Sequence, residues 1–352
     1  MTQVQIERFD AIAAITITLP EGFLTDETVA ELNAVTAELD RDESCRAMVF
    51  TGGSDGVFIR HFSVMALESL SDQLRERGLT FSDKKLLEKD REIDVLFRRL
   101  ATTPKITIAA INGFAMGGGF EFCLSCDLRI AQNGEHHLGL PEAKLGILPG
   151  AGGTQKLSRL VGQARALEMV TRGRTLKPRE ALELGMVHEV IDGPVLPRAL
   201  ELAREYAEIA PKAFGHIKRL IRQEAEKPLE DGLIIERTLF LDLLVSDDAS
   251  KLMKRMNAGD LDIRFADNYV ADFVINDNTA HILMVSEKGI KDVLDVVSGN
   301  ITSIKSFVVA TSKEQLPDES VTLENTASNT VAFKVGQAFP NPFNPSTQLS
   351  LE

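Results

Sequence analysis

The chain has 352 residues and a formal net charge of −13, from 39 Lys and Arg against 52 Asp and Glu. This length predicts two or three domains, and the acidic balance argues against nucleic acid or an anionic membrane surface as the main partner. Three cysteines are too few for a disulfide scaffold and indicate a reducing compartment. We expect no secretory signal and no membrane span, because no basic stretch precedes an apolar one at the start and no run of 18 apolar residues occurs.

The first part of the chain alternates strand-like and helix-like runs, which predicts an α/β fold. The first two strands form a hairpin that turns at Asp10 and Ala11. Strands are predicted at residues 3–9, 11–19, 46–53, 105–113, 128–132 and 136–142. Helices are predicted at residues 26–39, within 71–100, and at 120–127, 150–161 and 164–172.

The pattern is helical from Pro194 to about Asn257, with breaks predicted at Pro211 and Pro228. After Gly259 the composition shifts to Asn, Ser and Thr, and residues 259–352 hold 6 Lys and Arg against 13 Asp and Glu. Strand-like runs follow at 270–276, 281–286, 303–311, 320–325 and 330–335, which predicts a small β-rich module. We therefore expect a core over 1–193, a helical segment over 194–258, a β-rich module over 259–335 and a Pro/Asn-rich tail over 336–352.

Three consecutive glycines, residues 117–119, lie between a predicted strand and a predicted helix. Backbone N–H groups at a helix start can stabilise developing negative charge, and glycine lets a ligand approach the backbone closely. The same glycines could simply form a tight strand-to-helix turn. A nucleotide site is not indicated, because neither Gly-Lys-Ser/Thr nor the G-x-G-x-x-G spacing is present.

Two acidic residues frame this glycine run in the sequence. Glu121 lies in the first turn of the predicted helix, where a carboxylate also complements the helix dipole. Glu142 follows Leu140 and Pro141 at the end of a strand-like run. Two carboxyl groups beside a Gly-rich oxyanion site would form a general acid/base pair, but the spacing alone leaves open whether they converge.

The run AAINGFAMGGGFEFCLSCDLRIA, followed by LPEAKLGILPGAGGTQKLSRLVG, resembles the signature of the crotonase (enoyl-CoA hydratase/isomerase) family. The similarity covers about residues 3–257. It implies a spiral of β-β-α units with a helical C-terminal segment that builds trimers, often paired into hexamers. It also implies a cytoplasmic enzyme that acts on an acyl-CoA thioester, with no metal and no cofactor other than the coenzyme A of its substrate.

The resemblance assigns roles to individual residues. Gly118 matches the oxyanion-hole glycine, and the loop FIRHFSV places Phe62 at the position of the second N–H donor. Glu121 matches the carboxylate that activates water, and Glu142 matches the acid that protonates the α-carbon. The residues expected to contact substrate are Phe62, Ser63, Val64, Gly117, Gly118 and Pro141.

The presence of both glutamates favours hydration of a 2-enoyl-CoA, since isomerases of this family commonly work with a single carboxylate. An enoyl-CoA isomerase, or another acyl-CoA enzyme on the same scaffold, is the first alternative. The second is a secreted binding or adhesion protein whose β-rich tail is the working part, because QAFPNPFNPSTQLSLE resembles the start of a type IX secretion sorting domain. RNA binding is disfavoured by the net charge of −6 on residues 1–258.

Several other polar residues have both a functional and a structural interpretation. Cys123 and Cys126 are interpreted as core thiols rather than metal ligands, and His136 and His137 as surface residues. His61 lies beside the predicted oxyanion loop and could contact substrate. Basic residues on the C-terminal helices either reach the coenzyme A nucleotide or form a solvated face: Lys212, Lys218, Arg219, Arg222, Lys251, Lys254 and Arg255.

Overall fold

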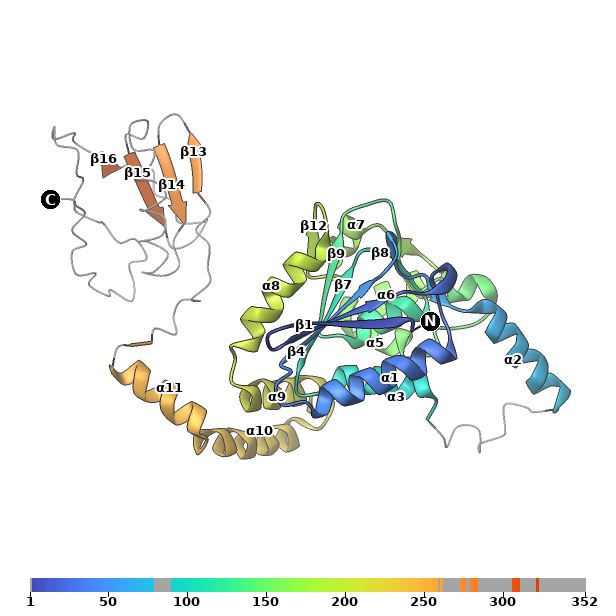
Figure 1. Ribbon diagram of the computed structural model, residues 1–352, viewed down its shortest axis with the longest axis horizontal. Coiled ribbons are helices and arrows are strands. Elements are labelled where there is room, and N and C mark those ends of the chain that lie inside the picture. The colour runs from blue at the N-terminus through green and yellow to red at the C-terminus, as the bar shows by residue number, and fades with distance from the viewer. Residues whose placement is uncertain are drawn as a thin grey trace. The chain divides into compact units, whose positions relative to one another are not determined.

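The computed structural model describes residues 2–78, 90–258 and 260–261, together with the backbone of four short strands between residues 273 and 322 (Figure 1). The chain divides into two compact units, Met1–Ala249 and Ser250–Glu352. The first unit is a mixed α/β structure, as the alternating sequence pattern predicts, and it contains all the residues proposed for the site.

A six-stranded sheet in the order β1-β2-β4-β7-β9-β12 forms the centre of the first unit. Its strands are β1 Val4–Phe9, β2 Ile12–Ile17, β4 Ala47–Gly52, β7 Ile106–Ile111, β9 Leu128–Gln132 and β12 Glu189–Ile191. The predicted hairpin is confirmed: β1 and β2 pair antiparallel, Phe9 lies opposite Ile12, and Asp10 adopts a φ of 52° at the turn. The other neighbours are parallel, which explains the almost continuous apolar runs of β4 and β7.

The chain repeatedly leaves this sheet to add a second strand to another one, which produces successive β-β-α units. The second sheet has the order β11-β10-β8-β5. Its strands are β5 Gly56–Ile59, β8 Gly113–Met116, β10 Leu138–Gly139 and β11 Thr175–Leu176. The corner between β7 and β8 needs glycine, because a Cβ atom on Gly113 would lie 1.8 Å from the Gly56 carbonyl carbon. The Asn112 side chain holds this corner through hydrogen bonds of 3.0 Å to the N–H and carbonyl of Gly52.

Helices cover both faces of the six-stranded sheet, as Figure 1 shows. On β2, Ile12 and Ala14 point to the face covered by α8 (Val195–Ala207), while Ala13 and Ile15 point to the opposite face. The helices that cover the opposite face are α1 Asp26–Arg41, α3 Glu92–Thr102 and α4 Gly118–Ser125. The core is therefore two apolar layers separated by the sheet, and α4 in the second layer carries the glycine run into it.

Most predicted helices are present, with shifted starts. The expected helical region within 71–100 contains α3, but α2 (Val64–Glu76) begins earlier than predicted. Its N-cap is Ser63, whose hydroxyl accepts a hydrogen bond of 3.3 Å from the Ala66 N–H. The helix predicted from Gly150 begins at Gly153. The remaining helices of this region are α5 Gly153–Val161, α6 Gln163–Thr171 and α7 Pro178–Glu183.

The chain from α8 to Ala258 is largely helical, as the sequence predicts, and two helices begin at the predicted proline breaks. Pro211 opens α9, and Pro228 directly precedes α10. The helices are α9 Pro211–Arg219, α10 Leu229–Leu244 and α11 Asp247–Ala258, and a π-helical segment, Leu220–Glu224, follows α9. None of the helices in the described part of the chain is long and apolar enough to cross a membrane.

In the second unit, four short strands pair in the order β13-β14-β15-β16. They are β13 Phe273–Asn276, β14 Thr279–Leu283, β15 Ser306–Ala310 and β16 Val321–Thr322. They fall within or overlap the first four strand-like runs predicted after Gly259. The fifth predicted run, 330–335, and the Pro/Asn-rich tail over 336–352 lie outside the described residues.

Candidate active site

The glycine run turns the chain from β8 into α4 with its backbone amides at the helix start. Gly117 has φ 54° and ψ −130°, a conformation that residues with a Cβ atom rarely adopt. Its carbonyl oxygen accepts hydrogen bonds of 2.9 Å from the N–H groups of Phe120 and Glu121. Gly118 is the first residue of α4, so its N–H has no acceptor within the helix and is available to a ligand.

The backbone of Phe62 lies beside Gly118. A Cβ atom on Gly118 would lie 3.5 Å from the Phe62 nitrogen and 3.2 Å from the Phe62 Cβ. Phe62 belongs to the short strand β6 (His61–Phe62), which pairs with Leu24 of β3 (Phe23–Leu24). Gly119 lets α4 approach this region, because a Cβ atom there would lie 2.0 Å from the Ile59 carbonyl oxygen. The two amides predicted to form an oxyanion hole are therefore neighbours.

Glu121 is buried in the first turn of α4, with 3% of its surface exposed. Its Oε1 accepts hydrogen bonds of 2.8 Å from the N–H groups of both Ala151 and Gly153, in the loop before α5. Burial raises the pKa of Glu121, and these two N–H groups and the charges of Lys156 and Arg91 oppose the rise. The carboxyl group is thus held in one orientation by the second glycine-rich loop.

Glu142 approaches the glycine run from a different part of the chain. It opens the 3₁₀ turn Glu142–Leu145 directly after Pro141, and a Cβ atom on Gly117 would lie 3.1 Å from its Oε1. Its Oε2 is buried and has no hydrogen-bond partner among the residues that the structure describes. Burial raises the pKa of Glu142 to about 7, with a smaller contribution from the charge of Glu121. The Glu142 carboxyl group therefore lies beside the glycine run and close enough to Glu121 for their charges to interact.

The other residues expected to contact substrate lie around this centre with different roles. Ser63 uses its hydroxyl to cap α2, and its N–H donates to the Leu24 carbonyl at 2.9 Å, so both groups have structural partners. Val64, in the first turn of α2, is 42% exposed. Pro141 is partly buried, and its carbonyl accepts a hydrogen bond of 3.0 Å from the Lys144 N–H.

His61 borders the site, but its ring contacts other groups of the protein. The imidazole stacks on Phe23 with ring centroids 4.5 Å apart, and Nδ1 lies 2.8 Å from the Phe62 carbonyl oxygen. The backbone of His61 is close to the glycine run, because a Cβ atom on Gly117 would lie 3.5 Å from the His61 Cβ. In this structure His61 therefore supports the strand that carries the Phe62 amide.

Two cationic residues beside Glu121 were not identified from the sequence. Lys156 Nζ donates to Ser125 Oγ at 2.6 Å, and that hydroxyl donates to the Glu121 carbonyl oxygen at 2.7 Å. Arg91 donates to the Gly150 carbonyl at 2.6 Å and pairs with Asp94. Lys156 follows a Gly-Gly-Thr-Gln run that gave no reason to single it out, and Arg91 lies in a charged stretch. Only the three-dimensional arrangement relates Lys156 and Arg91 to Glu121.

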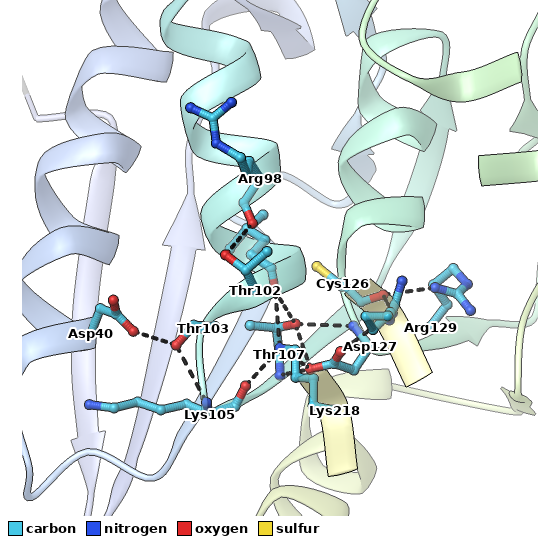
Figure 2. Close-up of polar contacts among 12 residues, drawn as sticks. Asp40, Arg98, Thr102, Thr103, Lys105, Thr107, Cys126, Asp127, Arg129 and Lys218 are labelled. Atoms are coloured by element: carbon cyan, nitrogen blue, oxygen red, sulfur yellow. Dashed lines mark hydrogen bonds and ion pairs between the residues drawn. The ribbon is translucent and has the colours of Figure 1, made fainter. Parts of the chain in front are cut away.

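The basic residues on the C-terminal helices divide into buried and exposed groups. Lys218 lies in the core rather than on a solvated face: Nζ is 2.7 Å from Asp127 Oδ2 and also donates to the carbonyls of Leu100 and Lys105 (Figure 2). Arg222 donates to the Cys126 carbonyl at 2.8 Å. Arg222 is nevertheless exposed, as are Lys251, Lys254 and Arg255 on α11.

The cysteine interpretation is confirmed and one histidine interpretation is wrong. Cys123 and Cys126 are buried free thiols, and burial raises the pKa of Cys126 to about 12. His136 is buried rather than on the surface, because its ring packs edge-on against Phe114, 6.2 Å between centroids. His137 is partly buried, and its Nδ1 lies 2.9 Å from Thr175 Oγ1. In the described part of the chain, no three His, Cys, Asp or Glu residues are grouped so that they could hold a metal ion.

Comparison with known proteins gives a consistent result over the first unit. A family model described as enoyl-CoA hydratase/isomerase matches residues 7–258. A short-chain-enoyl-CoA hydratase from Clostridium acetobutylicum is 31% identical over 256 residues, which cover 72% of this chain and 94% of that protein. A solved enoyl-CoA hydratase from Geobacillus kaustophilus superposes with a TM-score of 0.67 at 29% identity, covering 74% of this chain and 96% of the other.

A second solved structure, an enoyl-CoA hydratase from Thermoplasma volcanium, gives a TM-score of 0.62 at 28% identity and covers 72% of this chain and 97% of the other. These matches confirm the crotonase fold that the glycine and glutamate motifs predict. Together with the family model, they show that the chain belongs to the enoyl-CoA hydratase/isomerase family.

Proposed function

We propose that this chain adds water across the 2,3 double bond of a 2-enoyl-CoA thioester. In this reaction Glu121 deprotonates the water that attacks the β-carbon, and Glu142 delivers a proton to the α-carbon. The amides of Phe62 and Gly118 bind the thioester carbonyl oxygen. The observation that carries the proposal is the position of the Glu142 carboxyl group beside Gly117, directly before the helix that carries Gly118 and Glu121.

The different surroundings of the two acids support different roles. Glu121 Oε1 accepts two backbone N–H groups, an arrangement that favours a carboxylate. Glu142 has a pKa of about 7 and a buried oxygen without a partner among the described residues, which favours a protonated carboxyl group that can donate. Addition of water needs one group that accepts a proton and one that donates a proton at the same pH. Different surroundings of Glu121 and Glu142 can supply this difference.

The paired amides supply the electrostatic part of the mechanism. As water adds to the β-carbon, negative charge develops on the thioester oxygen, and fixed N–H donors stabilise it without reorganising. Each such donor is typically worth roughly 10²–10³ in rate. Because a backbone N–H is supplied by any residue except proline, Phe62 can fill this position, while its side chain packs partly buried against the apolar core.

Substitution of each acid by its amide tests the proposal. We expect Glu121→Gln and Glu142→Gln each to lower kcat for crotonyl-CoA by roughly 10²–10⁴, the usual contribution of a positioned acid or base, with substrate binding retained. Loss of the conjugated thioester absorbance measures turnover. Glu135→Gln, an exposed glutamate paired with Lys177, serves as the control and should be unaffected.

The assay also separates the alternatives. Near-normal hydration by Glu142→Gln would contradict the two-glutamate mechanism. A wild-type protein that moves the double bond of a 3-enoyl-CoA but does not hydrate a 2-enoyl-CoA would instead be an isomerase. The secreted-protein alternative predicts full-length chain in the medium with its tail cleaved, and no turnover of either thioester.

The remaining features follow from the proposed reaction. Acid/base addition of water needs no metal and no cofactor beyond the coenzyme A that the substrate carries. Because acyl-CoA thioesters are intracellular, we propose a cytoplasmic enzyme of fatty-acid or related acyl-CoA metabolism. We also propose that it works as a homotrimer or a hexamer, since the C-terminal helices carry exposed apolar side chains.

A further inference from the structure

Lys156 is a partly buried cation on the helix that follows the loop holding Glu121, and it has no part in the proposed mechanism. It lies on α5, and its Nζ donates to Ser125 Oγ at 2.6 Å. Ser125 is fully buried one turn after Glu121 on α4, and its hydroxyl donates to the Glu121 carbonyl oxygen at 2.7 Å. The ammonium group is therefore tied through one hydroxyl to the helical turn that carries the carboxylate.

The surroundings of Lys156 are built to enclose its ammonium group. Nζ lies over the Phe97 ring, 5.2 Å from its centroid. A Cβ atom on Gly152 would lie 3.3 Å from both Cε and Nζ, so the absence of a side chain there leaves room for the lysine. An ammonium removed from water needs a countercharge, and Ser125, its hydrogen-bonding partner among the described residues, is neutral.

We propose that Lys156 is a positioning residue that keeps Glu121 in the ionised form required of a general base. This inference rests on the proposed hydratase function for its role in turnover. The pairing through Ser125 also fixes the distance between the two helices, because α4 and α5 pack against each other at this point. The lysine therefore supplies charge to Glu121 and rigidity to the turn that presents it.

The other charged groups near Lys156 and Glu121 do not replace the charge of Lys156. Arg91 also faces Glu121, but its guanidinium makes two hydrogen bonds to Asp94, so most of its charge is compensated locally. The charges of Glu142 and Glu121 repel each other when both carboxyl groups are ionised.

Around the ammonium itself, Asp94 and the Cys126 thiol favour its charged form, and Arg222 opposes it. Burial lowers the pKa of Lys156, and Glu121 is the strongest group that acts against this.

The direction in which loss of Lys156 shifts the pH–rate profile follows from its charge. A nearby positive charge lowers the pKa of a carboxyl group, so removing the ammonium raises the pKa of Glu121 toward that of Glu142. Because the reaction needs Glu121 ionised and Glu142 protonated, the acid limb of the pH–rate profile then moves to higher pH while the basic limb near 7 stays. The profile becomes narrower and its maximum falls.

The test compares Lys156→Met, which keeps the length of the side chain, with Lys156→Arg, which keeps its charge. For crotonyl-CoA we expect Lys156→Met to move the acid limb of kcat/KM upward by about one pH unit, a roughly tenfold loss on that limb, with KM nearly unchanged. Lys156→Arg should retain most of the wild-type profile. An unchanged limb in Lys156→Met, or equal losses in both variants, would overturn the proposal.

A direct titration separates this inference from the hydratase assignment. Infrared difference spectra against Glu121→Gln isolate the carboxyl band of Glu121 in the full chain without any turnover. We expect this band to titrate at higher pH in Lys156→Met than in the wild type. If the wild type does not hydrate crotonyl-CoA but the band shifts, the hydratase proposal fails and the role of Lys156 stands. If the band does not move, the role of Lys156 fails whatever the activity.

Discussion

At the scale of single residues, Gly117 connects the two halves of the candidate site. Its left-handed backbone aims the following amide, and its missing side chain leaves space that the Glu142 carboxyl group approaches. A side chain at this position would therefore act on both the oxyanion site and the acid. The backbone conformation of Gly117 and the placement of the Glu142 side chain therefore both depend on glycine at this position.

We expect Gly117→Ala to lower kcat by at least about 10²-fold, because its methyl group would lie 3.1 Å from Glu142 Oε1 and would strain the turn before Gly118. Gly185→Ala is the matched control: its φ is also positive, at 70°, but nothing lies within 4 Å of the added methyl group. Steady-state kinetics and thermal unfolding of both variants separate the effects. Equal activity in the two variants would show that Gly117 matters only to backbone strain.

The residues of the candidate site differ in how far the sequence reveals them. Gly118, Glu121 and Glu142 lie in motifs whose order and spacing identify them, and Phe62 follows from the position of its loop. Lys156 could not be found in this way, because its meaning depends on a hydroxyl 31 positions earlier and on the packing of two helices. The burial of His136 was missed for the same reason, since its cover comes from a ring on another strand.

At the scale of secondary-structure elements, a buried polar cluster attaches α9 to the core. Figure 2 shows Lys218 reaching Asp127, whose Oδ2 also accepts hydrogen bonds from the N–H and hydroxyl of Thr107 at 2.9 and 3.0 Å. The side chains of Lys218 and Asp127 are only 4% and 12% exposed. The cluster joins α9 to the end of α3 through the Leu100 carbonyl.

We expect Lys218→Met to destabilise the protein by about 3–5 kcal/mol, because it leaves the buried Asp127 carboxylate without its closest cation. Lys212→Met is the control on the same helix: its pair with Asp242 is exposed, and its loss should cost less than about 1 kcal/mol. Chemical denaturation measures both values, and hydrogen exchange of α9 amides locates the change. Similar costs for the two variants would contradict an anchoring role for Lys218.

The elements themselves are largely predictable, and the errors have physical causes. The strands β1, β2, β4 and β7 follow from alternating or continuous apolar runs, and Pro211 and Pro228 mark helix starts correctly. The prediction placed the start of α2 too late, although Val64, Leu67 and Leu70 recur at helical spacing, and no residue of this helix is buried. The π-helical segment after α9 has no residue pattern of its own and depends on the packing around it.

At the scale of the whole molecule, the first unit leaves one helix with little cover. Every residue of α10 is at least partly exposed, including four large apolar side chains that are more than half exposed: Leu229, Ile234, Phe240 and Leu241. Single exposed apolar residues are ordinary, but several on one helix mark an interaction surface. Because the family model extends to residue 258, this helix belongs to the part of the chain that its relatives share.

We expect the purified chain to sediment as a trimer or a pair of trimers, and not as a 38.6 kDa monomer. The double variant Ile234→Asp/Leu241→Asp places two charges seven positions apart, on one face of α10, and should shift the protein toward monomer. Leu167→Asp on α6 is the control, because Leu167 is also more than half exposed, at 67%, but lies outside the C-terminal helices. Sedimentation velocity at micromolar concentration measures the oligomeric state, and circular dichroism verifies that each variant is folded. A monomeric wild type, or a double variant that keeps the assembly, would exclude α10 as the contact surface.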